Sequence, residues 1–279
     1  MTTLQQSTPA YLHHMRVVSL NPSVLVEFYQ RMLDLKPVES AQGDVVMTGP
    51  ARAIIVSNVA EGVEPYYAYS VADAHSLARL EARLTQRDVS FERIHDPLFE
   101  RGAVMIADPQ GRRFVFGVAA GQNVDVGAPA RLQHTVFQTT ELDNVVRFFV
   151  DSIGFTVSDE VVDTDGKVMV VFLRSDDEHH TLAFFRGSRN EWDHHCYETS
   201  EWNDIRDWGD RFAAAEVPIF FGPGRHGPGN NLFFMVTDPD GNRLEFSAEL
   251  QRVAMDAAPG VWPQSERTLN SWGRAWIRT

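Results

Sequence analysis

The stretch "NEWDHHCYETS", residues 190–200, sets two adjacent histidines beside the single cysteine of the chain. Four interpretations are open: polar surface residues, a Cys/His zinc site, a cysteine nucleophile with its base, or half of another metal site. One cysteine excludes an internal disulfide and a zinc site with several cysteines. Neighbouring residues of a strand point to opposite faces, which argues against a dyad of Cys196 and His195. The sequence therefore favours a metal site of another kind.

Two more residues at comparable strand positions extend this interpretation. His134 lies on one predicted strand, His195 on a second and Glu245 on a third. Two neutral imidazoles and one carboxylate bind one face of a metal and leave other positions open, which favours non-haem Fe(II) that handles O₂. One such histidine alone is more often a core or surface residue, but three at corresponding positions of a repeat favour ligands. We expect His194 to point outward, since it neighbours His195.

An internal repeat supplies the elements that position these residues. "LHHMRVVSLNPSVLVEFYQRMLDL" begins at Leu12, and the similar "LQHTVFQTTELDNVVRFFVDSIGF" begins at Leu132, 120 residues later. "ADPQGRRFVFGV" and "TDPDGNRLEFSA" form a second pair, offset by 130 residues. The first pair reads as strand, turn and amphipathic helix, and the second as a tight turn and a strand. The chain is therefore predicted to be a duplicated domain.

Each half divides again into one strand, one helix and three strands. In the second half these are "LQHTVFQT", a helix, "FTVSDEVV", "VMVVFLR" and "HTLAFFR", then "DHHCYET", a helix near 202–215, "VPIFF", "LFFMVT" and "RLEFSA". We predict an α+β fold of four βαβββ modules, paired into two domains whose curled mixed sheets each form a cup. The predicted parts are residues 1–118, a linker at 119–130, a metal-binding domain at 131–250 and a tail at 251–279.

Residues 132–250 resemble the catalytic domain of the type I extradiol (catechol ring-cleaving) dioxygenases, of the vicinal oxygen chelate superfamily. The motifs that carry the resemblance are "LQH", "DHHCYE", "DPDGNRLEF", "GPGRHGPGNN" and the late "SERTLNSWGRAW". The resemblance implies a vicinal oxygen chelate fold and a tail that covers the site. It also implies that His134, His195 and Glu245 bind Fe(II), with Mn(II) as the other metal.

Further positions follow from the same resemblance. His180 matches a catalytic acid/base, a role that suits imidazole because its unperturbed pKa lies near neutrality. His226 matches a histidine that contacts the substrate oxygens, and Asn230 also matches a substrate-binding position. Met235 stands where the family has a tyrosine, and a thioether cannot donate that hydrogen bond. Trp192 either lines the substrate cavity or packs in the core.

The N-terminal half lacks this set. His14, Tyr67 and Val115 align with the three predicted ligands, and valine cannot bind a metal. We expect this half to be metal-free and to serve packing or subunit contacts.

Composition limits the partners and the compartment. The 279 residues carry a net charge of −13, which argues against a nucleic acid or an anionic membrane as partner. No run of eighteen apolar residues and no signal peptide are evident, so we expect a cytoplasmic protein, working as a homo-oligomer.

The predicted function is an extradiol dioxygenase that inserts both atoms of O₂ into a catechol-type substrate. One alternative is a metal-dependent isomerase or lyase of the glyoxalase type, which usually uses more carboxylate ligands than the one found here. The other is a protein of the same fold that binds an aromatic metabolite without catalysis.

Overall fold

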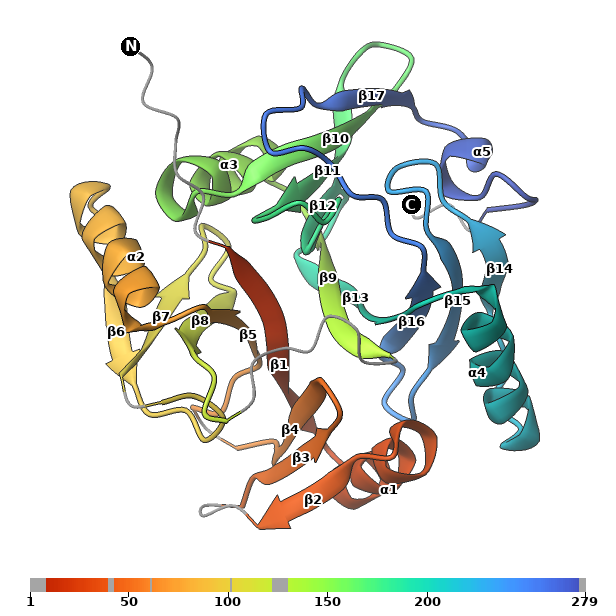
Figure 1. The fold of residues 1–279 in the computed structure, drawn as a ribbon, viewed down its shortest axis with the longest axis horizontal. Helices are drawn as coiled ribbons and strands as arrows, with labels where there is room; N and C mark the ends of the chain where they lie inside the picture. Colours follow the sequence, from red (N-terminus) through yellow and green to blue (C-terminus); the bar gives the residue numbers. More distant parts are fainter. Residues whose placement is uncertain (1–8, 40–42, 61, 101, 122–129, 276–279) are drawn as a thin grey trace.

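Two curled sheets, one from each half of the chain, dominate the computed structural model, which describes residues 9–39, 43–60, 62–100, 102–121 and 130–275 (Figure 1). The first sheet has eight strands in the order β2-β3-β4-β1-β5-β8-β7-β6. The second has nine, in the order β14-β15-β16-β13-β9-β12-β11-β10-β17. No helix of the described part is long and apolar enough to cross a membrane.

The first sheet is built from two βαβββ units in succession. Its elements are β1 (Ala10–Ser19), α1 (Pro22–Leu33), β2 (Lys36–Glu39), β3 (Val45–Gly49), β4 (Arg52–Asn58), β5 (Tyr66–Val71), α2 (Ala74–Gln86), β6 (Phe91–Ile94), β7 (Ala103–Ala107) and β8 (Arg113–Val118).

The second sheet repeats this order and adds a final strand and helix. Its elements are β9 (Arg131–Thr139), α3 (Leu142–Phe148), the π-helix η1 (Phe149–Ile153), β10 (Thr156–Val162), β11 (Val168–Arg174), β12 (Leu182–Arg186), β13 (Glu191–Thr199), α4 (Trp202–Ala214), β14 (Phe221–Arg225), β15 (Leu232–Thr237), β16 (Arg243–Ala248), β17 (Gly260–Pro263) and α5 (Glu266–Leu269). The prediction of four βαβββ modules is confirmed, although the segment "VPIFF" forms a strand only from Phe221 onward.

Local sequence explains where the helices begin and which face they bury. α1 has Pro22 at its first turn, where the missing N–H costs nothing, and it buries Leu25, Tyr29 and Met32 at helical spacing. α4 begins after Glu201, whose backbone N–H donates to the Asp204 carboxylate at 3.1 Å. The helices therefore lie against the sheets with their apolar faces inward.

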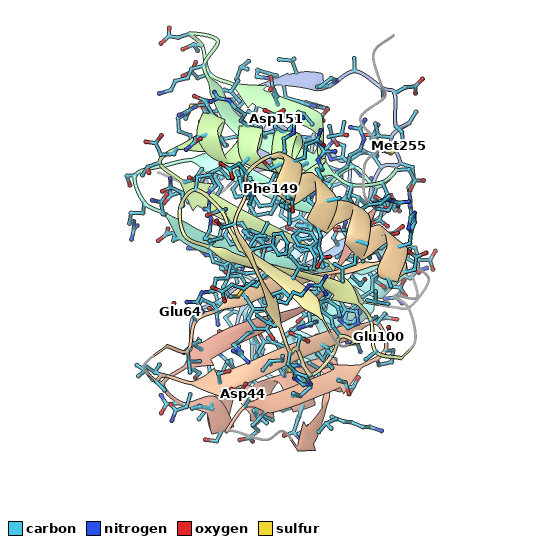
Figure 2. All side chains as sticks on the ribbon, turned by 90° about the vertical axis from the view of Figure 1, so that its left-hand side faces the viewer. Asp44, Glu64, Glu100, Phe149, Asp151 and Met255 are labelled. Carbon is cyan, nitrogen blue, oxygen red and sulfur yellow. The ribbon has the colours of Figure 1, made fainter. Side chains whose placement is uncertain are left out.

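One apolar core joins the two sheets. The rings of Tyr67 and Phe137 have centroids 4.6 Å apart, and those of Phe114 and Phe149 lie 4.9 Å apart. Phe149 is buried, whereas Asp151, two residues further along, is exposed; both are labelled in Figure 2. The strands that meet in this core are held rigidly by packing on both sides.

Strands β16, β13 and β9 are neighbours, and they form the floor of the second cup. β13 runs parallel to β16 and antiparallel to β9. β9 is buried along its whole length. At the far edge β17 pairs with β10, which brings the C-terminal tail over the cup. The division into domains at residues 118 and 131 stays a prediction, and most of the expected linker (122–129) lies outside the described residues.

Candidate metal centre and pocket

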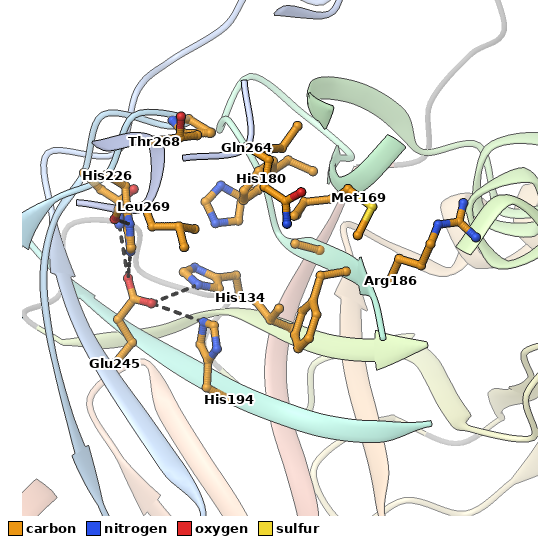
Figure 3. Close-up of a pocket in the computed structure, with 18 of the residues that line it drawn as sticks. His134, Met169, His180, Arg186, His194, His226, Glu245, Gln264, Thr268 and Leu269 are labelled. Atoms are coloured by element: carbon orange, nitrogen blue, oxygen red, sulfur yellow. Dashed lines mark hydrogen bonds and ion pairs between the residues drawn. The ribbon is translucent and has the colours of Figure 1, made fainter. Parts of the chain in front are cut away.

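Three side chains from neighbouring strands converge at one end of a pocket in the second sheet (Figure 3). They are His134 on β9, His194 on β13 and Glu245 on β16. The Glu245 Oε2 atom lies 3.2 Å from His194 Nε2 and 3.8 Å from His134 Nε2. All three residues are buried. Two imidazole nitrogens and a carboxylate oxygen thus face one point.

His195 points to the other side of β13, so its prediction as the second ligand is wrong. Its ring stacks on Trp192 with centroids 5.1 Å apart, and it meets Tyr197 edge-on at the same distance. Neither ring nitrogen has a hydrogen-bond partner within the described chain. Burial lowers the pKa of His195 to about 3, so the ring is neutral at pH 7. His195 is a core residue.

The sheet register explains the error. Cys196 pairs with His134 on one side and with Glu245 on the other, so these three residues share one face of the sheet. Alternation along β13 then puts His194 on that face and His195 on the opposite one. We expected His194 to point outward, but it faces the pocket in the position predicted for His195.

Acceptors behind both histidines orient the rings. The Gln133 Oε1 atom lies beside His134 Nδ1, and Asp193 Oδ1 lies 2.5 Å from His194 Nδ1. The other Asp193 oxygen accepts from Arg243 at 2.9 Å. With each Nδ1–H donated backward, each Nε2 presents its lone pair to the site. This is how proteins fix the tautomer of metal-binding histidines.

The charges of the site match a cation-binding role. Burial would raise the pKa of Glu245, but His134 and His194 hold it well below its ordinary value. Burial would also lower the pKa of His194, yet Asp193 and Glu245 raise it above the ordinary value. Burial lowers the pKa of His134. Glu245 is therefore a buried carboxylate that requires a positive partner, which a divalent metal would supply.

Cys196 lies behind this group. A ligand atom of Cys196 comes within 4.8 Å of those of His134 and Glu245. Burial and then the Glu245 charge raise the pKa of the thiol well above its ordinary value. Cys196 is not among the residues that line the pocket. The set that faces the pocket remains two imidazoles and one carboxylate.

His180 lies where the sequence placed it, on the pocket wall opposite the carboxylate. Its ring centroid is 4.4 Å from that of His134. Burial, together with His134 and His179, holds the pKa of His180 well below its ordinary value. The ring is therefore neutral, which is the form that a general base must have before it takes a proton.

His226 also lines the pocket, just after β14. Its Nδ1–H donates to the carbonyl oxygen of Leu269 at 2.6 Å, and its ring stacks on Phe233 with centroids 3.8 Å apart. Its Nε2 atom lies 3.8 Å from Glu245 Oε1. A ring fixed in this way presents Nε2 toward whatever binds at the metal end.

Asn230, the predicted substrate contact, is exposed and sits in a turn with φ of 52°, so that prediction is wrong. Its neighbour Asn231 is buried and lines the pocket. Asn231 Nδ2 donates to Glu245 Oε1 at 3.1 Å and to Ser247 Oγ at 2.9 Å. Its Oδ1 atom has no partner among the described residues. Asn231 thus orients the carboxylate.

Met235 and Trp192 have different outcomes. Met235 is buried, pairs with Glu245 across β15 and β16, and lines the pocket as predicted.

Trp192 does not line this pocket. It borders a second cavity of about 430 Å³ with Tyr67, and its Nε1–H donates to the His194 carbonyl at 2.9 Å. A register shift in β13 between Trp192 and His194 turns the indole to the core side.

The pocket has a volume of about 320 Å³, at the small end of the range for ligand sites. Beyond the metal end its walls are apolar, and Arg186 lies at the far end (Figure 3). The apolar lining residues are Val136, Val161, Met169, Val170, Phe172, Ala183, Phe185, Pro228, Met235 and Leu269. Gln264, Ser265 and Thr268 from the tail close one side.

The corresponding place in the first sheet is filled differently. His14 and Val115 both pair with Ala68, which makes Tyr66 the counterpart of His194. The Asp96 Oδ2 atom accepts from Tyr66 at 2.6 Å and lies 3.1 Å from His14 Nε2. That this half binds no metal stays a prediction.

Sequence reasoning missed His194 and Asn231, each one position from a predicted residue. A signal for His194 was available, because Tyr197 is a large aromatic residue of the core and shares its strand face with His195. No comparable signal marked Asn231, since two asparagines stand together in a loop. Gln133 and Asp193, which hold the ligand rings, also gave no signal.

A family model supports the relationship suggested by the motifs. Residues 131–246 match the Glyoxalase/Bleomycin resistance protein/Dioxygenase superfamily. The chain is 28% identical to metapyrocatechase 2 of Cupriavidus necator over 169 residues, which are 59% of this chain and 50% of that protein. It is 27% identical to a biphenyl-2,3-diol 1,2-dioxygenase of Metapseudomonas furukawaii, over 66% of this chain and 67% of that protein.

Solved structures share the whole fold. The 2,3-dioxygenase LapB from Pseudomonas sp. KL28 superposes with a TM-score of 0.79 at 22% identity, covering 94% of this chain and 99% of that one. A Mn(II)-bound glyoxalase from Novosphingobium aromaticivorans gives 0.77 at 22% identity, with 96% and 91% covered. The chain spans about half the length of the first curated relatives it matches. The predicted resemblance is confirmed: residues 131–246 match the superfamily model, and the relatives named above are dioxygenases.

Proposed function

We propose that this chain is an extradiol ring-cleaving dioxygenase that inserts both atoms of O₂ into a catechol-type substrate. The observation that carries the proposal is the convergence of His134 Nε2, His194 Nε2 and Glu245 Oε2 beside an apolar pocket. Relatives named metapyrocatechase and biphenyl-2,3-diol 1,2-dioxygenase support it.

The donor set fits a divalent metal. Both imidazoles are held with Nε2 toward the site, and the carboxylate is buried and ionised. This ligand set favours Fe(II), and a relative named as a manganese-dependent dioxygenase supports Mn(II) as the other candidate. When bound there, such a metal would supply positions for the diol and for O₂. His134, His194 and Glu245 would hold it.

The protein's own residues would handle protons and orientation. His180, neutral because of burial and its histidine neighbours, would take a proton from one substrate hydroxyl and later return it. His226 would face the substrate oxygens with Nε2, because Nδ1 is occupied by Leu269. Asn231 would keep the Glu245 carboxylate in place. The tail residues would exclude water from the pocket.

The pocket shape supports an apolar ring substituent on the diol. From the metal end the cavity continues between aliphatic and aromatic side chains, including Met169 and Phe185. Met235 offers a flexible apolar surface and no hydrogen-bond donor. We therefore propose a catechol that carries an alkyl or aryl group, and not unsubstituted catechol. A cytoplasmic homo-oligomer remains part of this proposal.

Oxygen uptake after anaerobic metal loading tests the function. The protein is loaded with Fe(II) or Mn(II) and mixed with catechol, alkylcatechols and arylcatechols, and ¹⁸O₂ is used to follow oxygen into the product. We expect both labelled atoms in the ring-opened product and faster turnover of the substituted catechols. Glu245→Ala, loaded in the same way, is the matched control.

Two other results would overturn the proposal. Turnover of a glutathione hemithioacetal without O₂ uptake would indicate an isomerase of the glyoxalase type. Tight catechol binding with no turnover under either metal would indicate a binding protein.

A further inference from the structure

His180 is not isolated in the pocket wall, because a second buried histidine stands behind it. The Nδ1 atoms of His179 and His180 lie 3.0 Å apart, and the two rings meet edge-to-face. His179 is 1% exposed and does not line the pocket. The proposed chemistry gives His179 no role, yet it contacts the nitrogen of His180 that faces away from the substrate.

Asp159 stands on the far side of His179. Its Oδ2 atom lies 3.0 Å from His179 Nε2. That Nε2 makes no well-aligned hydrogen bond among the described residues, so a small rotation of the ring would complete one with Asp159. Burial would raise the pKa of Asp159, but His179, Trp262 and the backbone of Gly260 lower it. Asp159 is therefore an ionised acceptor at neutral pH.

The same carboxylate anchors the C-terminal tail. Trp262 Nε1–H donates to Asp159 Oδ2 at 2.7 Å, and the Gly260 N–H donates to Oδ1 at 3.1 Å. Asp159 and Gly260 are also paired in the β10–β17 register. The tail segment that closes the pocket and the histidine behind His180 thus meet at one side chain.

The hydrogen bonds along the series Asp159, His179 and His180 determine which ring nitrogen of each histidine carries the proton. A carboxylate only accepts, so His179 must direct its Nε2–H toward Asp159, and a neutral His179 then has a lone pair on Nδ1. Only one proton can lie between the two Nδ1 atoms, so it belongs to His180. The second nitrogen of His180, Nε2, is then left with its lone pair for the pocket. That is the form in which His180 can accept a substrate proton.

We propose that His179 is a positioning residue which, held by Asp159, fixes the orientation and the Nδ1–H tautomer of His180, and that Asp159 ties this arrangement to the closed tail. The proposal rests on the proposed function for the role of His180, but the tautomer itself does not depend on that function. Orientation of a catalytic imidazole by a hydrogen-bonded partner is a general device.

The tautomers are read by long-range ¹H–¹⁵N NMR of metal-free protein labelled with ¹⁵N-histidine, with His180→Gln used to assign the signal. We expect the Nδ1–H form for His180 and the Nε2–H form for His179. Asp159→Asn is made in a Trp262→Phe background, because Trp262 Nε1–H donates to the same Oδ2 atom and would otherwise hold the amide oxygen there. In that background the amide can donate to His179 Nε2, so both histidines should switch tautomer, whereas Trp262→Phe alone should switch neither. Val261→Ala, an exposed neighbour of Trp262 on the same strand, should change neither signal.

Steady-state kinetics of the metal-loaded protein supply the second readout. In the Trp262→Phe background, Asp159→Asn should lower kcat by roughly tenfold to a hundredfold, part of the ~10²–10⁴ that a general acid/base contributes, with little change in KM. His179→Asn retains an acceptor near the Nδ1 position and should keep most of the rate. His179→Phe lacks that acceptor and should not.

Two results would overturn the proposal: an Nε2–H tautomer for His180 in the parent protein, or an unchanged tautomer and kcat when Asp159→Asn is added to Trp262→Phe. If His179→Phe fails to fold, Asp159→Asn still decides, because it preserves size and shape. Absence of ring cleavage leaves the NMR result standing, so failure of the proposed function and failure of this inference are distinguishable.

Discussion

Phenylalanine in place of each of the two adjacent histidines, His194 and His195, should give opposite results. His194→Phe removes an imidazole that lies 3.2 Å from Glu245 and should strongly weaken metal binding. His195→Phe removes an imidazole that contacts only the core side, so metal content should not change. We also expect the second variant to be more stable than the parent protein.

The stability gain follows from the surroundings of His195. Both of its ring nitrogens are buried without a partner among the described residues, and each unsatisfied polar atom costs about 1–3 kcal/mol. The ring is neutral, since burial lowers the pKa of His195 to about 3, so no charge is lost. The larger phenyl ring must fit between Trp192 and Tyr197, and overpacking costs about 1–3 kcal/mol. The net gain should be about 1–3 kcal/mol.

For the metal, His194→Phe should lower affinity by more than about 100-fold. Loss of a residue that only orients a metal ligand already costs about 10–100-fold, and His194 would be a ligand itself.

Two measurements check the pair. Metal content after Fe(II) or Mn(II) loading is determined by mass spectrometry, and thermal unfolding is followed in metal-free protein. A gain of 1 kcal/mol corresponds to about 2–4 °C in Tm for a domain of this size. Metal lost from His195→Phe and retained in His194→Phe would refute our assignment of the strand faces.

Three further predictions concern the pocket and the first sheet. His180→Phe should retain metal and lower kcat by roughly 10²–10⁴, and unaltered turnover would exclude an acid/base role. Met235→Tyr supplies a hydrogen-bond donor, and such a bond to a charged oxygen contributes about 1.5–3 kcal/mol. The variant should therefore raise the turnover of small catechols about tenfold to a hundredfold and lower that of bulky ones. Equal gains for both classes in steady-state assays would contradict an apolar substituent site. Burial, then His14, lowers the pKa of His13 to about 3. Between about pH 6.5 and pH 3, His13 is therefore protonated in the unfolded chain but neutral in the folded one. The free energy of unfolding falls over this range by up to ~1.4 kcal/mol per pH unit as the pH is lowered. His13→Asn should lack this loss in urea unfolding at several pH values, and parallel curves for the two proteins would refute the reasoning.

The module order was readable from the sequence because it depends on local patterns. Repeated strand–helix signals and the paired turn motifs gave four βαβββ units, and the structure contains them. The same patterns put His134, His180, His226, Glu245 and Met235 on strands or loops of one unit pair, and all five line one pocket.

Strand pairing established the side-chain directions on β13, where the sequence offered only the indirect signal of Tyr197. β13 is buried on both faces, so its burial shows no alternation that could separate His194 from His195. The choice depends on Cys196 lying opposite both His134 and Glu245, which is a property of three strands together.

What the sequence by itself determined is the set of elements and the kinds of donor they carry, because spacing and periodicity are local. What only the tertiary structure decided is which donors meet. Asp159 on β10 lies beside His179, which belongs to a loop. The same carboxylate accepts from Trp262, which is 103 residues further along the chain. Asn231 reaches Glu245 across two strands. Such contacts depend on sheet register and on closure of the tail, and a one-residue shift in register reverses the face of every side chain on a strand.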